Sequence, residues 1–258
     1  MSKNEQQFSH VRRATTNRNT RISCYRHRGA EPLLDSAPEK GPSNLRLLKG
    51  VEVGSYKINR RLSQGKHEWF DEKCFIIDGN KRRPQAFAPR IATQRITGVD
   101  ERKRIVAMEI GPPCYFADST NSLAIGKACK YNARFILGLL NSKLMQWRFK
   151  VTSTNNNVGT NELENLPFPS LDFAKHSDLT HHDKMVGLVT QMLEAKKQEA
   201  AAVNESKGDY WKSKCATLER QIDTLVYELY GLTPAEIAIV EGTAPVSAAS
   251  DGEGTGNE

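Results

Sequence analysis

The sequence predicts an α+β protein in which a small, mostly β domain with one amphipathic helix is followed by a C-terminal helical hairpin. Three patterns lead to this prediction. Short apolar runs alternate with turn residues between 50 and 125, and apolar residues then recur at helical spacing between 131 and 149. A longer helical pattern begins after 178. We therefore expect one domain at 49–172 and a helical unit at 178–243.

The two ends of the chain lack any such pattern. Residues 1–48 mix arginines with turn-forming residues, and Pro32, Pro38 and Pro42 would interrupt a helix or strand there. Residues 244–258 are small, polar and acidic. We expect a disordered basic arm at 1–48 and a disordered acidic tail at 244–258.

The β-rich stretch contains five predicted strands. They cover 51–58, 75–77, 90–96, 104–110 and 114–117. Gly111, Pro112 and Pro113 supply turn chemistry between the last two. The run 118–122 (DSTNS) is so polar that it predicts a loop with Asx and Ser/Thr turns.

Helical spacing appears in three stretches. The first is 131–149, and the polar run 152–157 predicts a loop after it. Two long amphipathic helices follow, separated by a polar break at 204–208, which favours a hairpin or coiled-coil-like arm. Their apolar positions are Met185, Leu188, Val189, Met192 and Leu193, then Leu218, Ile222, Leu225, Val226 and Leu229.

The end of the second long helix is the most clearly signalled boundary. Gly231 is suited to a left-handed stop. Thr233, Pro234 and Glu236 then stand at the N-cap, first and third positions of a last short helix, which ends near Gly242.

Charge is distributed unevenly along the chain. Residues 1–150 hold 29 Lys and Arg against 13 Asp and Glu, a net charge of +16, whereas residues 151–258 hold 8 against 17, a net charge of −9. A polyanion such as nucleic acid is attracted to the first part and repelled by the second. The alternative is a basic surface that is merely solvated.

Several classes of protein are disfavoured. The sequence has no apolar run long enough to span a membrane and no secretory signal, so we expect a cytoplasmic protein without a membrane partner. Five widely spaced cysteines form neither a disulfide framework nor a zinc ribbon. We find no nucleotide-binding loop, hydrolase elbow or metal-ligand pattern, and we expect no catalytic residue and no metal site. His181 and His182 point in different directions on a helix, which favours capping or surface roles.

The candidate chemistry is DNA recognition. In a strand at 90–96, Arg90 and Gln94 share a face, and these residue types hold guanine and adenine edges with paired hydrogen bonds. Around 152–157, short hydroxyl and amide side chains follow cations, a mixture suited to phosphate contacts and groove entry. An ordinary half-buried strand and a plain solvated loop are the open alternatives. The candidate DNA contacts are Arg90, Gln94, Arg95, Lys143, Arg148, Lys150, Thr152, Ser153, Asn155 and Asn156.

Five blocks carry a family resemblance. They are 91–96 (IATQRI), 117–122 (ADSTNS), 132–149 (NARFILGLLNSKLMQWRF), 160–169 (TNELENLPFP) and 220–242 (RQIDTLVYELYGLTPAEIAIVEG). Together they resemble the C-terminal specificity region of TaqI-like and type IIG adenine-specific DNA methyltransferases, which is related to type I restriction specificity subunits. The resemblance covers roughly 50–243. It implies a target-recognition domain for a short double-stranded DNA site, followed by spacer helices that hold a methyltransferase or endonuclease subunit.

The chain departs from that family in one respect. It lacks the glycine-containing S-adenosylmethionine motif and the Asn-Pro-Pro-aromatic loop, because the run from Gly111 to Cys114 has neither the leading amide nor the closing aromatic residue. We therefore expect a specificity module of a restriction-modification system that binds no cofactor itself. S-adenosylmethionine and base flipping would belong to a partner or a missing catalytic domain. The alternatives are a protein-interaction module that docks on or inhibits a methyltransferase, and a truncated gene remnant.

Overall fold

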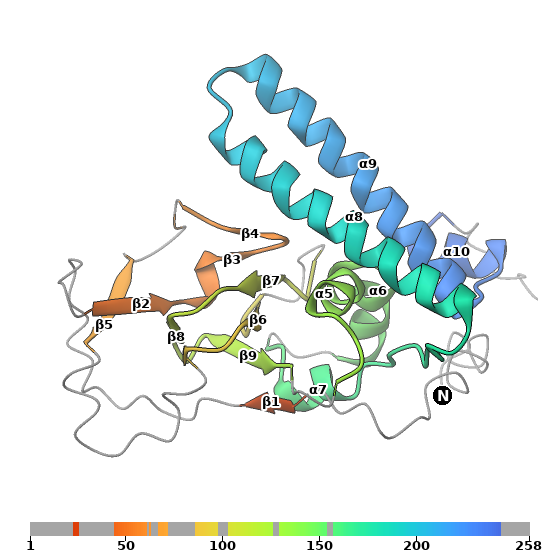
Figure 1. Cartoon of the computed structure of the whole chain (residues 1–258), viewed down its shortest axis with the longest axis horizontal. Coiled ribbons are helices and arrows are strands. Elements are labelled where there is room, and N and C mark those ends of the chain that lie inside the picture. Colours follow the sequence, from red (N-terminus) through yellow and green to blue (C-terminus); the bar gives the residue numbers. More distant parts are fainter. Residues whose placement is uncertain are drawn as a thin grey trace, which may run out of the picture.

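The architecture is taken from a computed structural model of the chain. It describes residues 23–25, 44–60, 62, 67–71, 86–97, 103–125, 129–153 and 157–243. The acidic tail, the predicted strand at 75–77 and most of the predicted arm lie outside the described residues. Within them the protein is mixed α+β, with small sheets and a C-terminal helical region, as the sequence predicts (Figure 1).

Three small sheets make up the β part of the described residues. The largest is antiparallel and has the order β1 (Ser23–Tyr25), β9 (Thr120–Ala124), β6 (Arg90–Gln94) and β7 (Ala107–Ile110). A second sheet pairs β2 (Asn44–Leu48) antiparallel with β5 (Glu68–Asp71) and parallel with β8 (Cys114–Phe116). The turn from 111 to 113 joins β7 to β8, where a turn was predicted.

Two segments of the predicted arm are ordered into these sheets. The backbone of β1 pairs with β9, and β2 lies between β5 and β8. The prediction of a disordered arm through residue 48 is therefore wrong at 23–25 and 44–48. The arginine-rich composition of the segment hid the apolar residues Leu45, Leu47 and Leu48, two of which are buried.

The predicted strand at 51–58 is divided by a tight turn. A short 3-10 helix, η1 (Gly50–Glu52), leads into β3 (Val53–Gly54), which pairs with β4 (Lys57–Ile58). Tyr56 lies in the turn with φ 59°, a left-handed conformation that reverses the chain. Its side chain is buried.

The run 118–122, predicted to be a loop, instead supplies most of strand β9. Thr120, Asn121 and Ser122 are all buried. The Thr120 hydroxyl donates to Leu48 O at 3.0 Å, and Asn121 Nδ2 donates to Val158 O at 2.9 Å. Because these partners satisfy the polar side chains, a polar segment occupies the middle of a sheet.

The predicted helix at 131–149 is two helices. They are α5 (Ala133–Asn141) and α6 (Lys143–Thr152). Ser142 is extended, ends α5 and caps α6 by accepting a hydrogen bond from Met145 N. A serine therefore breaks a helical period that the apolar pattern alone left continuous.

The C-terminal region consists of helices. After the short α7 (Thr160–Glu164), two 26-residue helices, α8 (His176–Ala201) and α9 (Glu205–Tyr230), lie side by side, and one end of the pair extends past β3 and β4 (Figure 1). The predicted stops and caps are confirmed. Gly231 and Gly242 have φ values of 62° and 71°, and Thr233 forms a capping box with Glu236 at the start of α10 (Pro234–Glu241).

One hydrophobic core joins the β part to the helices. It runs from Ile91 and Leu123 through α5 to α8 and α9. Gly138 allows α5 to approach α8 closely, because a Cβ at this position would lie 2.5 Å from Met185 Sδ. The two predicted domains therefore share their core, which fixes α8 against the sheets.

Candidate nucleic-acid interface

Two of the predicted base-reading residues are inside the protein. Arg90 is 3% exposed, and its guanidinium lies 4.0 Å from the centre of the Phe116 ring. It donates to Cys114 O and, at 3.4 Å, to Ser122 Oγ, and burial lowers the pKa of this guanidinium. Gln94 is half-buried and donates to Val53 O at 2.6 Å. Both side chains thus connect strands, and the prediction that they face DNA is not supported. Alternation suggested one outward face, but β6 is a central strand buried on both faces.

The other predicted contacts do not form one exposed surface. Arg95 pairs with Asp118, with 2.7 Å between Nη1 and Oδ1. Thr152 is exposed but donates its hydroxyl to Arg148 O at 2.9 Å, and Ser153 is buried. Arg148 is half-buried, and Asn155 and Asn156 lie outside the described residues.

Two of the predicted residues, Lys143 and Lys150, line one hollow of about 660 Å³ between α6 and α9. This α6–α9 hollow contains nearly balanced charge. Its four cations are Lys103, Lys143, Lys150 and Arg220, and its three carboxylates are Glu219, Asp223 and Glu241. Ion pairs cross it from Lys103 to Glu219 at 3.0 Å and from Lys143 to Glu241 at 2.9 Å.

Asp223 is the most deeply buried carboxylate of this hollow. It accepts a hydrogen bond from Lys143 N, at the start of α6, at 2.8 Å. Burial raises the pKa of Asp223 to about 6, against the opposing effects of this hydrogen bond and of the Lys143 charge. These contacts attach α6 to α9, so Lys143 has a structural role in joining the two helices.

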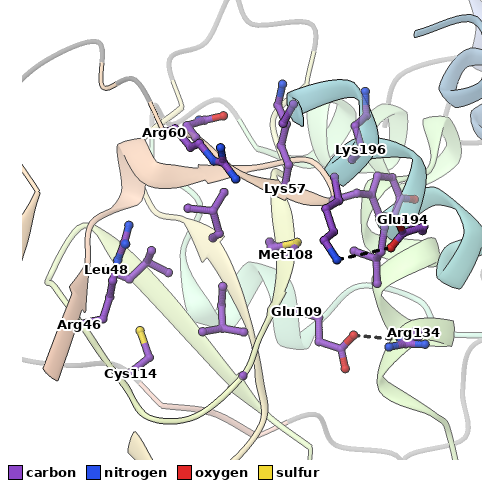
Figure 2. Close-up of a pocket in the computed structure, with 18 of the residues that line it drawn as sticks. Arg46, Leu48, Lys57, Arg60, Met108, Glu109, Cys114, Arg134, Glu194 and Lys196 are labelled. Atoms are coloured by element: carbon purple, nitrogen blue, oxygen red, sulfur yellow. Dashed lines mark hydrogen bonds and ion pairs between the residues drawn. The ribbon is translucent and has the colours of Figure 1, made fainter. Parts of the chain in front are cut away.

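A second hollow lies between the sheets and α8. We call it the basic cleft (Figure 2). It has a volume of about 780 Å³, and the described residues that line it include six Lys and Arg side chains and two carboxylates, Glu109 and Glu194. The cations are Arg46, Lys57, Arg60, Arg134, Lys196 and Lys197.

Four of these cations have carboxylate partners. Arg46 pairs with the fully buried Glu52, and Arg134 Nε lies 3.1 Å from Glu109 Oε2. On α8, Lys196 pairs with Glu199 at 3.0 Å and Lys197 with Glu194 at 3.9 Å. Burial alone lowers the pKa of Lys196, but the hydrogen bond and nearby negative charges raise it overall, so Lys196 keeps its charge.

Lys57 and Arg60 differ from these four. Both are exposed, and no carboxylate of the described residues lies within ion-pair distance of either. They come from β4 and the residues directly after it, and in Figure 2 they lie along the same edge of the cleft as Lys196 of α8. Among the described residues, this edge therefore presents two cations without a carboxylate partner, Lys57 and Arg60, beside Lys196, which is paired with Glu199.

His67 braces the loop that carries Arg60. Its Nδ1 lies 2.8 Å from Glu52 Oε1, and its Nε2 lies 3.0 Å from Arg60 O. Because Glu52 also contacts Arg46 and Lys49 N, one buried carboxylate organises the wall of the cleft.

The floor of the cleft is apolar. Leu48, Ile110 and Cys114 are buried there, with Ile58 and Met108 partly buried beside them. Burial raises the pKa of the Cys114 thiol to about 11, so this cysteine is protonated and is no nucleophile at neutral pH. Among the described residues, no three or more His, Cys, Asp and Glu side chains cluster in a way that could hold a metal ion.

Sequence reasoning missed this cleft. Its cations come from 46–60, from α5 and from α8, and the last of these lies in the part of the chain with net negative charge. The positive balance of residues 1–150 was the only available signal, and it did not single out Lys57, Arg60 or Lys196.

No protein-family model matches the chain, and no curated protein matches its sequence. In the part of the chain that the structure describes, none of the helices combines the length and apolar character of a membrane span.

Proposed function

We propose that this chain binds double-stranded DNA through the basic cleft, as the sequence-recognition module of a restriction-modification system. The observation that carries the proposal is the edge formed by Lys57, Arg60 and Lys196, where positive charge from two elements converges beside a concave surface. Phosphate contacts by such side chains supply most of the affinity and fix the register of a protein on DNA.

The family resemblance supports the finer part of the proposal. In this account the module acts with, or derives from, an adenine-specific DNA methyltransferase. The hairpin formed by α8 and α9 serves as the spacer that holds the catalytic or endonuclease subunit. S-adenosylmethionine binds to that partner, where the adenine is taken out of the helix.

The test is binding of the full chain to a randomised duplex DNA pool at two salt concentrations, with the bound DNA sequenced. A short motif that stays enriched at the higher salt concentration is the expected result. Binding without enrichment, lost steeply with salt, would contradict sequence recognition and leave only a basic surface.

A second candidate function has one specific observation in its favour. At the end of the helix pair that extends past the sheets, Val203 is 90% exposed and Tyr210 is 62% exposed. Exposed apolar groups of this kind favour protein docking, so the chain could act as an interaction module that inhibits a methyltransferase. A folded chain that binds no DNA in the experiment above would favour this function over DNA recognition.

A further inference from the structure

The basic cleft combines two chemistries that phosphate binding alone does not require. Its edge carries Lys57, Arg60 and Lys196, whereas its floor is built from Leu48, Met108 and Cys114. Figure 2 shows Leu48 and Cys114 away from the edge that carries Lys57, Arg60 and Lys196, with Arg46 beside Leu48. A ligand that matches both parts has an apolar face and an anionic group.

The volume of the cleft limits the size of that ligand. At about 780 Å³ it lies within the range of roughly 300–1,000 Å³ that small-molecule sites occupy. The bases of an intact duplex stack on their neighbours and cannot leave the helix without unpairing. An unpaired base can turn away from the strand and place its face on an apolar surface.

Polar groups for the edge of a base are present on one wall. Glu109 and Arg134 form an ion pair through Oε2 and Nε, and their side chains are 26% and 37% exposed. Since each carboxylate oxygen accepts hydrogen bonds, Glu109 keeps acceptor capacity beyond this pair. Figure 2 shows both groups in the wall of the cleft, on the side of α5.

We infer that the basic cleft binds one unpaired nucleotide of a DNA strand. The base lies on the floor beside Met108, its edge faces Glu109, and its phosphate lies among Lys57, Arg60 and Lys196. The inference rests on the proposed function, because the strand must first bind to the cleft, and it specifies which element of the DNA enters.

The experiment compares two DNAs on the full chain. One is a perfect duplex, and the other has the same sequence with a single extra, unpaired adenine. We expect the bulged DNA to bind about tenfold more tightly, because the face of the unpaired base leaves water for the apolar floor of the cleft. A 2-aminopurine in place of the extra adenine is expected to change its fluorescence when the chain binds.

Two variants fill the cleft from opposite walls. Met108→Trp extends from β7 and Leu193→Trp from α8, and both positions line the cleft. Each is expected to remove the preference for the bulge, measured as the ratio of the affinity for the bulged DNA to the affinity for the perfect duplex, because the filled cleft no longer admits a base. Leu179→Trp, on α8 outside the cleft, is the matched control and keeps the preference.

The outcomes separate the two proposals. Equal affinity of the wild-type chain for both DNAs, with no fluorescence change, overturns the inference and leaves the proposed function intact. No binding to either DNA overturns both. If deoxyadenosine monophosphate binds as tightly as the bulged DNA, the site belongs to a free nucleotide, and the assignment to a strand is overturned.

Discussion

The basic cleft and the α6–α9 hollow lie on either side of Tyr56, which lines both, and they are close in size at about 780 and 660 Å³. They differ in the net charge of the described side chains that line them, although each has two cations without an ion pair among the described residues. The α6–α9 hollow sets four cations against three carboxylates, and two ion pairs cross it. The cleft sets six cations against two carboxylates.

This difference shows why the number of lysines and arginines in a segment does not identify a binding surface. Lys143 satisfies Glu241 with its ammonium and Asp223 with its backbone N–H, so it joins α6 to α9 and α10. Lys57 in β4 and Arg60 directly after it were not singled out from the sequence, yet the fold brings them beside α8 without a carboxylate partner among the described residues. Pairing, which only the fold determines, separates the two roles.

The largest expected effect is loss of DNA binding on charge reversal in the cleft. In the double variant Lys57→Glu, Arg60→Glu, two attractive contacts become repulsive. Affinity for duplex DNA is expected to fall by at least about a hundredfold, since a charged hydrogen bond contributes about 1.5–3 kcal/mol. Fluorescence anisotropy with labelled duplex measures the change.

The matched control reverses two exposed lysines of α9. Lys207→Glu, Lys212→Glu makes the same change in net charge at positions that line neither hollow. If this control weakened binding as strongly as the cleft variant, general electrostatics would explain the effect and the cleft would have no special role.

The second effect concerns stability and belongs to the α6–α9 hollow alone. Because the pKa of Asp223 is about 6 in the folded chain and 3.8 ordinarily, the folded state binds a proton that the unfolded state releases. This contribution to the free energy of unfolding is full below pH 3.8 and is lost as the pH rises through about 6. Its size is on the order of 2–3 kcal/mol.

Asp223→Asn removes the titration while keeping an oxygen that accepts from Lys143 N. Urea unfolding at several pH values is expected to show the wild-type chain losing stability relative to the variant between pH 4 and about 6. Lys103, Glu219 and Tyr227 are the charged or polar neighbours of position 223 in both proteins. A constant difference across this pH range would contradict the assignment.

The helix ends that the sequence predicted correctly are those whose signals act within a few residues. Gly231 and the Thr233–Glu236 capping box act within a few residues, and the structure confirms them. Ser142 also acts locally, but its cap lies inside an unbroken apolar period and was missed. Strand β9 was missed because its polar side chains are satisfied by Leu48 and Val158, which are distant in sequence.

The candidate site shows the same limit more strongly. Arg90 was predicted to face DNA because the alternation of side chains gives a strand two faces. The alternation does not say whether either face is exposed. The stacking of its guanidinium on Phe116 depends on the second sheet, which no local pattern predicts. The cleft joins three separate segments, so its cations could not be grouped from their order in the chain.

A smaller effect tests whether Arg90 has a structural role or contacts DNA. Arg90→Met keeps an unbranched apolar side chain but removes the guanidinium and leaves Cys114 O without its donor, so the free energy of unfolding is expected to fall by about 1–2 kcal/mol. Duplex affinity, measured under conditions where the variant is folded, is expected to stay unchanged. A relaxed DNA sequence preference at wild-type stability would restore Arg90 as a base-reading residue.

The most direct test of the central claim is the slope of duplex affinity against salt concentration, measured for the wild-type chain and two neutralised double variants. For Lys57→Gln, Arg60→Gln we expect the slope to decrease by about 2, one for each lost phosphate contact. For Lys143→Gln, Lys150→Gln we expect the slope of the wild-type chain. The reverse result, a reduced slope only in the second variant, would contradict the account and place the DNA on α6.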